Sequence, residues 1–174
     1  MNLSLIVLFF CLIFVFIQNV KNQTEGDSAE DDTILDSDQA PNFNLTTLNG
    51  EEIELKDLQG KGVLVNFWSS WCGPCKNEMP EIQKVYDFYK SQGLEVLAVN
   101  YGESKETIQN FLEDHPTLNF TILLEDDQVS EKYMIANLPT TYFINKDGEI
   151  VNRYMGELNE EQLHVFVNEI LPKE

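Results

Sequence analysis

From residue 42 onward, the pattern of apolar and polar positions predicts a series of β-strands and helices. Residues 42–55 alternate between apolar and polar side chains around Asn49-Gly50, which predicts a β-hairpin. Residues 62–68 form an almost continuous apolar run, which is typical of a central strand that is buried on both faces. Further strands are expected over residues 94–101, 119–124, 140–144 and 149–154. The segment 145–148, Asn-Lys-Asp-Gly, predicts a turn that makes the last two strands an antiparallel edge.

Helices are predicted between these strands by apolar residues spaced three and four positions apart. The helix that carries Cys75 presents one apolar stripe, formed by Met79, Ile82, Val85, Tyr86 and Tyr89. A second helix is capped by Ser104 and stops before Pro116, and the last opens with Asn159 and Gln162 as a capping pair. This alternation of strands and helices, which ends in a hairpin, predicts an α/β fold with a mixed central β-sheet flanked by helices.

The first 39 residues differ from the rest of the chain. Residues 3–17 form an almost unbroken apolar run, whose length lies between a signal-peptide core and a full membrane span. No small-x-small cleavage site comes after it, so we expect an uncleaved membrane anchor over residues 1–21. Residues 22–39 contain seven carboxylates and almost no apolar side chains, which predicts an acidic disordered tether. Residues 40–174 are then long enough for one domain with one core.

The anchor also indicates where the domain functions. Signal-like amino-terminal segments usually direct the export of the domain behind them, so we expect a single-pass protein of the cell membrane with its domain on the extracytoplasmic side. Lys21, at the end of the run, weakly favours the opposite orientation by the positive-inside rule. The whole chain has 30 acidic and 11 basic residues, a net charge of −19. Such a surface excludes nucleic-acid binding through a basic patch and favours basic partners.

The strongest chemical signal is the motif Cys72-Gly73-Pro74-Cys75, which comes after the strand predicted at 62–68 and opens a helix. Two cysteines three positions apart on the first turn of a helix can form a disulfide. The free amides and the dipole at the helix N-terminus favour the thiolate form of the leading cysteine. Cys72 is therefore the candidate nucleophile for a partner disulfide, and Cys75 is the candidate resolving cysteine. This chemistry moves two electrons and requires no cofactor or metal.

Two other interpretations of the motif agree poorly with the rest of the chain. A zinc site needs about four ligands, and only Cys11, His115 and His164 remain, with Cys11 inside the apolar run. An inert structural disulfide across so few residues would close too small a loop to stabilise the chain much. Both interpretations remain open, but redox chemistry is favoured.

A second signal lies far downstream, where Leu138-Pro139-Thr140 opens a strand rich in β-branched and aromatic residues. Together with Trp71–Lys76, this segment resembles the thioredoxin superfamily. The resemblance implies a thioredoxin-like fold in which Pro139 is a cis-proline whose loop, Leu138, Pro139 and Thr140, faces the cysteines and holds the substrate backbone. Without the resemblance, an ordinary trans proline at the start of a strand remains the alternative.

Within that superfamily, the domain is more similar to the membrane-tethered TlpA/ResA-like branch than to plain thioredoxins. The segment between Cys72 and Pro139 is longer than in plain thioredoxins, which leaves room for a central helix and strand inserted at 104–124. Asn66 stands where cytoplasmic thioredoxins carry a buried aspartate, and Glu78 matches a glutamate that this branch carries near its cysteines. The Gly73-Pro74 dipeptide departs from the branch and is the one that thioredoxins use, so the branch's redox potential does not transfer.

Two further side chains near the motif are candidate site residues. Glu78 lies one helical turn beyond Cys75 and could carry protons during exchange, with a pKa raised by burial. The alternative is a solvated glutamate that complements the helix N-terminus. Trp71 adjoins Cys72 and could form an apolar contact surface for a peptide substrate, so we expect it to be more exposed than Trp68. Hydrophobic packing is the alternative for both tryptophans.

The combined prediction is an extracytoplasmic thiol–disulfide oxidoreductase. The resemblance implies a reductase of disulfides in exported proteins, for example the haem-site cysteines of apocytochromes c, with a membrane thiol–disulfide carrier as its electron donor. We expect a monomer. The alternatives are an oxidase or isomerase, which would need a more oxidising cysteine pair, or a thioredoxin-fold binding module without catalysis. A peroxiredoxin-type peroxidase is disfavoured, because residues 68–71 do not supply the threonine that its nucleophile normally needs.

Overall fold

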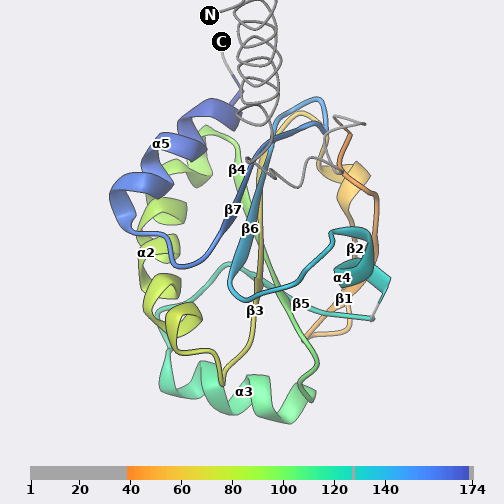
Figure 1. Cartoon of the computed structure of the whole chain (residues 1–174), viewed down its shortest axis with the longest axis vertical. Helices are drawn as coiled ribbons and strands as arrows, with labels where there is room; N and C mark the ends of the chain where they lie inside the picture. Colours follow the sequence, from red (N-terminus) through yellow and green to blue (C-terminus); the bar gives the residue numbers. More distant parts are fainter. Residues whose placement is uncertain (1–38, 127, 173–174) are drawn as a thin grey trace, which may run out of the picture. The chain divides into compact units, whose positions relative to one another are not determined.

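The computed structural model describes residues 39–126 and 128–172, which contain a seven-stranded mixed β-sheet (Figure 1). The strands lie side by side across the sheet in the order β2-β1-β5-β4-β3-β6-β7. Their bounds are β1 Asn44–Thr47, β2 Glu52–Glu54, β3 Gly62–Trp68, β4 Leu94–Asn100, β5 Thr121–Leu124, β6 Thr140–Ile144 and β7 Ile150–Met155. The helices are α2 Gly73–Tyr89, α3 Lys105–Asp114, α4 Gln128–Lys132 and α5 Glu160–Ile170, with 3₁₀ turns at Leu55–Leu58 and Lys90–Gln92.

Strand β3 determines where the functional segments meet. It runs parallel to β4 along its whole length and antiparallel to β6, with Phe67 opposite Thr140. Because β6 runs in the opposite direction, the end of β3 and the start of β6 lie at the same edge of the sheet. The cysteine motif just after β3 and the Leu138–Pro139 segment just before β6 are therefore brought to this edge from distant parts of the sequence.

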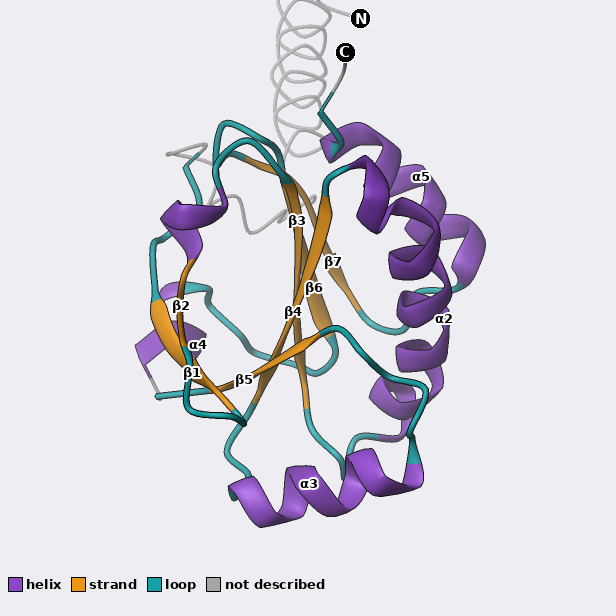
Figure 2. Ribbon diagram, turned by 180° about the vertical axis from the view of Figure 1, so that it is seen from behind, coloured by secondary structure: helices purple, strands orange, loops and turns teal. Residues whose placement is uncertain are grey.

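Helices cover both faces of the sheet (Figure 2). Helices α2 and α5 lie side by side on one face, where their apolar stripes pack with Leu64, Trp68 and Phe143 in the main core. Helix α4 lies on the other side of the sheet. Tyr133, the residue after it, is fully buried, and its ring lies 5.4 Å from that of Phe67. Both layers bury apolar surface, which is the main favourable contribution to folding.

Most of the predicted elements are confirmed. The hairpin turns at Asn49-Gly50, and Ser104 caps α3, which with β5 forms the predicted central insertion. Asn159 and Gln162 form a reciprocal capping box at the start of α5. Helix α4 was not predicted. The thioredoxin-like α/β prediction, with a mixed central sheet flanked by helices and an N-terminal hairpin, agrees with this architecture.

The predictions for the amino-terminal segment concern residues that the structure, apart from Gln39, does not describe. The expected anchor, residues 1–21, and the expected tether up to residue 38 lie outside the described residues. Gln39, the last residue assigned to the tether, pairs with Glu149 in an isolated β-bridge. Within residues 39–126 and 128–172, no helix is both long enough and apolar enough to cross a membrane.

Candidate active site

Cys72 and Cys75 form a disulfide at the N-terminus of α2. Cys72 is the N-cap residue, and its Sγ accepts a hydrogen bond from the backbone N–H of Cys75 over 3.2 Å. Pro74 lies in the first turn, where its missing N–H costs nothing and its fixed φ suits the helix. The side chains differ in accessibility, since Cys72 is 6% exposed and Cys75 is fully buried. Both cysteines are therefore buried, and Cys72 is the one that keeps some exposed surface.

The Leu138–Pro139 peptide bond is cis, as the resemblance implied. The backbone N–H of Gly156, just beyond β7, donates to the carbonyl of Pro139 over 2.9 Å. The hydroxyl of Thr140 donates to the carbonyl of Asn137 over 2.8 Å, and Pro139 and Thr140 are both buried. Leu138, only half-buried, is the most accessible residue of the predicted substrate loop. The loop is thus held by a hydrogen bond of its own and by one from Gly156, and its role in substrate binding stays a prediction.

Glu78 is buried in the core beside the motif. Its Oε1 accepts a hydrogen bond from Nδ2 of Asn66 over 2.6 Å, and its Oε2 accepts one from the backbone N–H of Leu158 over 2.9 Å. Burial raises the pKa of Glu78 to about 7, while these two donors oppose the rise and the charge of Glu157 adds to it. A carboxyl group with this pKa can both accept and release a proton near neutral pH.

Asn66 links Glu78 to the neighbouring strand. It is fully buried on β3, and its Nδ2 also donates to the hydroxyl of Thr141 on β6 over 3.0 Å. Its carbonyl oxygen, Oδ1, is buried without a hydrogen-bond partner. The position that holds an aspartate in cytoplasmic thioredoxins therefore contacts the carboxyl group of Glu78 in this chain. Both residues were singled out from the sequence, but the contact between them was not predicted.

The two tryptophans occupy different environments, as predicted. Trp68 ends β3 inside the core, where its ring lies 5.0 Å from that of Phe111 on α3. Trp71 is 67% exposed next to Cys72. Packing in the core explains the presence of a tryptophan at position 68. It does not explain the one at position 71, because the large apolar surface of Trp71 is available for contact with another molecule.

Glu103 is a site residue that was not predicted from the sequence. It lies between β4 and α3, and its carboxylate accepts hydrogen bonds from both the backbone N–H and the hydroxyl of Ser70, the first of these over 2.7 Å. Nδ2 of Asn100 donates to the same carboxylate over 2.8 Å. These contacts fix the loop that leads into Cys72. Because β3 and β4 are parallel neighbours, the loops at their carboxyl ends lie at the same edge of the sheet. This relation between the two strands was the only feature from which the role of Glu103 could have been predicted.

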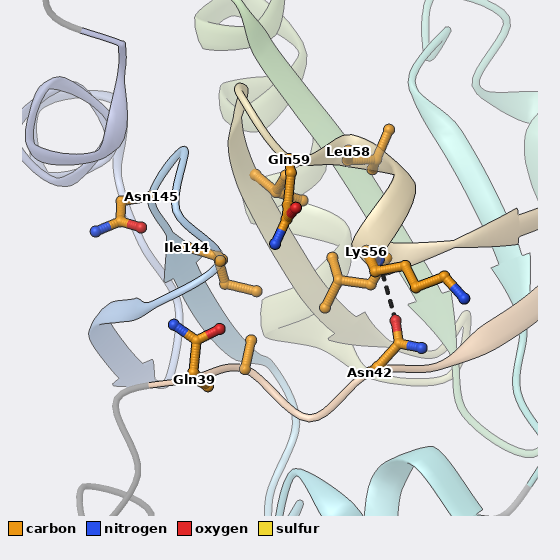
Figure 3. A pocket seen from close by; sticks show the side chains of 11 residues that line it. Gln39, Asn42, Lys56, Leu58, Gln59, Ile144 and Asn145 are labelled. Atoms are coloured by element: carbon orange, nitrogen blue, oxygen red, sulfur yellow. Dashed lines mark hydrogen bonds between the residues drawn. The ribbon is translucent and has the colours of Figure 1, made fainter.

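A separate cavity of about 120 Å³ lies at the other end of β3, where Val63 and Ile144 form part of its lining (Figure 3). At its edge, the backbone N–H of Lys56 donates to Oδ1 of Asn42 over 3.0 Å. The cavity has no cysteine in its lining. In the part of the chain that the structure describes, no group of three or more His, Cys, Asp or Glu side chains is placed to hold a metal ion.

Comparisons with known proteins agree with this geometry. Residues 37–153 match the model of the AhpC/TSA family. The chain belongs to the AhpC/TSA family. A relative from Bacillus subtilis named thiol-disulfide oxidoreductase ResA is 44% identical over 144 residues, which cover 82% of this chain and 80% of the relative. A ResA from Halalkalibacterium halodurans is 44% identical over 137 residues, which cover 78% of this chain and 77% of that protein.

Solved structures support the same assignment for this member of the AhpC/TSA family. The thioredoxin domain of a thiol-disulfide oxidoreductase from Bacteroides vulgatus superposes with a TM-score of 0.68 at 28% identity, covering 77% of this chain and 96% of that one. StoA from Bacillus subtilis superposes with a TM-score of 0.64 at 29% identity, covering 75% and 98%. The thioredoxin-like fold and the TlpA/ResA-like resemblance are thereby confirmed. With its Cys72–Cys75 pair, the chain is a thiol–disulfide oxidoreductase.

Proposed function

We propose that this oxidoreductase reduces disulfides in exported proteins, with Cys72 as the nucleophile and Cys75 as the resolving cysteine. The observation that carries the proposal is the asymmetry of the pair, in which Cys72 is the N-cap residue of α2 with 6% of its surface exposed while Cys75 has none. The cysteine that keeps some exposed surface is the one that a protein substrate can approach. The fully buried cysteine is placed to react with its neighbour.

The reaction then proceeds in two exchanges that start from the reduced enzyme. The Cys72 thiolate attacks one sulfur of the substrate disulfide, which breaks as the other sulfur leaves with the electron pair and takes up a proton. Cys75 loses its proton and attacks Sγ of Cys72. The Cys72–substrate bond breaks, and the second substrate sulfur leaves as a thiolate and is protonated. The substrate gains two electrons, and the enzyme returns to its Cys72–Cys75 disulfide form.

Glu78 serves in this proposal as the group that accepts the Cys75 proton. It lies one helical turn beyond Cys75, so the two side chains project from neighbouring positions on α2. Its pKa of about 7 gives it a substantial carboxylate fraction near neutral pH. Two hydrogen bonds stabilise that carboxylate inside the core. These properties support proton transfer over the alternative of a solvated glutamate.

The proposed substrate contacts are the exposed ring of Trp71 and the loop Leu138, Pro139 and Thr140. Re-reduction by a membrane thiol–disulfide carrier, with residues 1–21 as the anchor, completes the cycle. Apocytochrome c haem-site cysteines are one substrate class that such a reductase would serve. The reducing direction is supported by the Gly73-Pro74 dipeptide, which the chain shares with reducing thioredoxins. The acidic composition supports exported partners with basic surfaces.

A trapping experiment with the full chain tests this proposal. In a Cys75→Ser variant, the mixed disulfide between Cys72 and its substrate cannot be resolved, so adducts with exported proteins should accumulate and be released by a thiol reductant. The matched control is the double variant Cys72→Ser/Cys75→Ser, which should form none. Adducts that are absent, or that persist in the double variant, would contradict the proposal.

A further inference from the structure

Asn66 has a feature that disulfide exchange by the cysteines does not explain. It lies in the core with its Oδ1 unpaired, while its Nδ2 makes two hydrogen bonds. A buried polar atom without a partner destabilises the fold, and native proteins rarely retain one without a reason. A leucine of similar size would avoid this cost. The amide that contacts Glu78 thus keeps an unused acceptor.

Both hydrogen-bond neighbours of the Asn66 amide can also act as donors. Oε1 of Glu78 and Oγ1 of Thr141 both lie within hydrogen-bond distance of Nδ2, at 2.6 and 3.0 Å. The hydroxyl of Thr141 can donate as well as accept, and the carboxyl group of Glu78 donates once it is protonated. A half-turn of the amide about its Cβ–Cγ bond exchanges Nδ2 and Oδ1 with little change of shape. Oδ1 of the reversed amide would then accept from both neighbours, and Nδ2 would take the position that Oδ1 holds now.

We propose that Asn66 is the positioning residue of Glu78 and that its amide reverses when Glu78 gains a proton. The structure shows Nδ2 donating to Oε1 of Glu78, which is the contact that suits the ionised carboxylate. With Glu78 protonated, the carboxyl O–H donates to Oδ1 of the reversed amide. Glu78 thus keeps a hydrogen-bond partner on β3 in both protonation states. The inference deepens the proposed function, because it gives the proton carrier of that reaction a partner for each state.

The surroundings of Glu78 leave this role to Asn66. Strands β3 and β6 present the neutral groups of Asn66 and Thr141, and the β7–α5 loop presents the backbone N–H of Leu158. The charge that acts on Glu78 from that loop is Glu157, itself held by Nδ2 of Asn77 over 3.2 Å. On α2, Cys75 lies one turn before Glu78 and does not titrate while it is disulfide-bonded, and Glu81 lies one turn after it and forms an ion pair with Lys84 over 2.9 Å. The backbone N–H can donate only, so Asn66 is the partner here that can change from donor to acceptor.

The test is an NMR titration of the full oxidised chain, which requires no variant. The side-chain carboxyl ¹³C signal of Glu78 and the side-chain amide ¹⁵N signal of Asn66 should shift with one common midpoint, near the pKa of about 7. The Glu78→Gln variant should remove the shift of the Asn66 amide. Gln83 is the matched control, since it is a buried amide on α2 that contacts Asp87 and the backbone of Asn119. If Glu78 titrates while the Asn66 amide stays unchanged, the inference is wrong.

A substitution separates the inference from the proposed function. Asn66→Leu removes the donor that stabilises the carboxylate, so the pKa of Glu78 should rise further, by roughly one unit. Gln83→Leu removes a buried amide away from Glu78 and should leave that pKa unchanged. An unchanged pKa in Asn66→Leu contradicts the inference, whatever the enzyme reduces. Conversely, if Glu78→Gln exchanges disulfides at the parent rate, the proton-carrier role fails while the amide coupling can still be measured.

Discussion

Asn66 donates a hydrogen bond to Glu78 across 2.6 Å in the core, which ties β3 to the helix that carries the cysteines. Burial of Glu78 opposes its charge and raises its pKa to about 7, while this hydrogen bond opposes the rise. An exposed glutamate would have little influence on stability or catalysis near neutral pH. The burial of Glu78 links both properties to pH.

Stability should therefore depend on pH through Glu78. The folded-state pKa of about 7 lies above the ordinary value of 4.5, so the folded state retains a proton that the unfolded state loses between these values. The free energy of unfolding should fall across this window by about 3 kcal/mol from Glu78 alone and level off above it. Urea unfolding of the parent and of Glu78→Gln at several pH values measures this contribution of Glu78. If the two proteins differ in free energy of unfolding by the same amount at every pH, the prediction is wrong.

Glu78→Gln should also slow disulfide exchange. The amide keeps the size of the side chain but cannot take up the Cys75 proton, so resolution of the mixed disulfide should slow by about 10²-fold, the lower end of the usual effect of general acid–base catalysis. Stopped-flow measurement of reduction of a peptide disulfide, across the pH window of Glu78, gives the rate. The exchange rate of the parent should show an inflection near pH 7, and the rate of the variant should lack it. Identical profiles would show that Glu78 carries no proton.

Trp71→Ala should impair substrate contact and leave the fold intact. The side chain is 67% exposed, so its removal should change the free energy of unfolding by less than about 0.5 kcal/mol. Exchange with a peptide disulfide should slow by about tenfold, the loss of one modest apolar contact, while exchange with a small disulfide reagent stays unchanged. Phe88→Ala provides the control, since Phe88 is 62% exposed at the far end of α2. Equal effects of the two variants would exclude a specific role for Trp71.

Glu103→Gln should loosen the loop before Cys72. Its carboxylate accepts hydrogen bonds from Ser70 and Asn100, and an amide cannot accept all of them in the same geometry. We expect a loss of about 1 to 2 kcal/mol in the free energy of unfolding, together with faster amide hydrogen exchange at Ser70. Glu113→Gln, at an exposed position of α3, should change neither. Unaltered exchange at Ser70 would show that Glu103 does not hold the loop.

The sequence predicted the features that local pattern determines. The apolar run of β3, the stripe of α2, the Ser104 cap and the CxxC motif each depend on residues close together in the chain. Family resemblance supplied the cis conformation at Leu138–Pro139, which local pattern left open. Helix α4 escaped prediction because a segment as short as Gln128–Lys132 leaves too few turns for an apolar period to show.

The contacts that support the site could not be predicted, because they depend on strand register. The side chain of Asn66 points toward α2 only because β3 alternates in that phase, and it meets Thr141 only because the two residues pair across β3 and β6. Glu103 reaches Ser70 because parallel strands bring the loops at their carboxyl ends together. A shift of one residue in either register would turn these side chains to the opposite face.

The reduction potential of the Cys72–Cys75 pair tests the central claim most directly. The purified chain would be equilibrated against defined thiol buffers, and the free thiols of these two cysteines would be quantified by alkylation and mass spectrometry. We predict a potential near or below about −250 mV, in the range of thioredoxin, which makes the enzyme an electron donor to exported disulfides. A potential near about −120 mV would make it an oxidant of thiols and would contradict the proposed direction of electron flow.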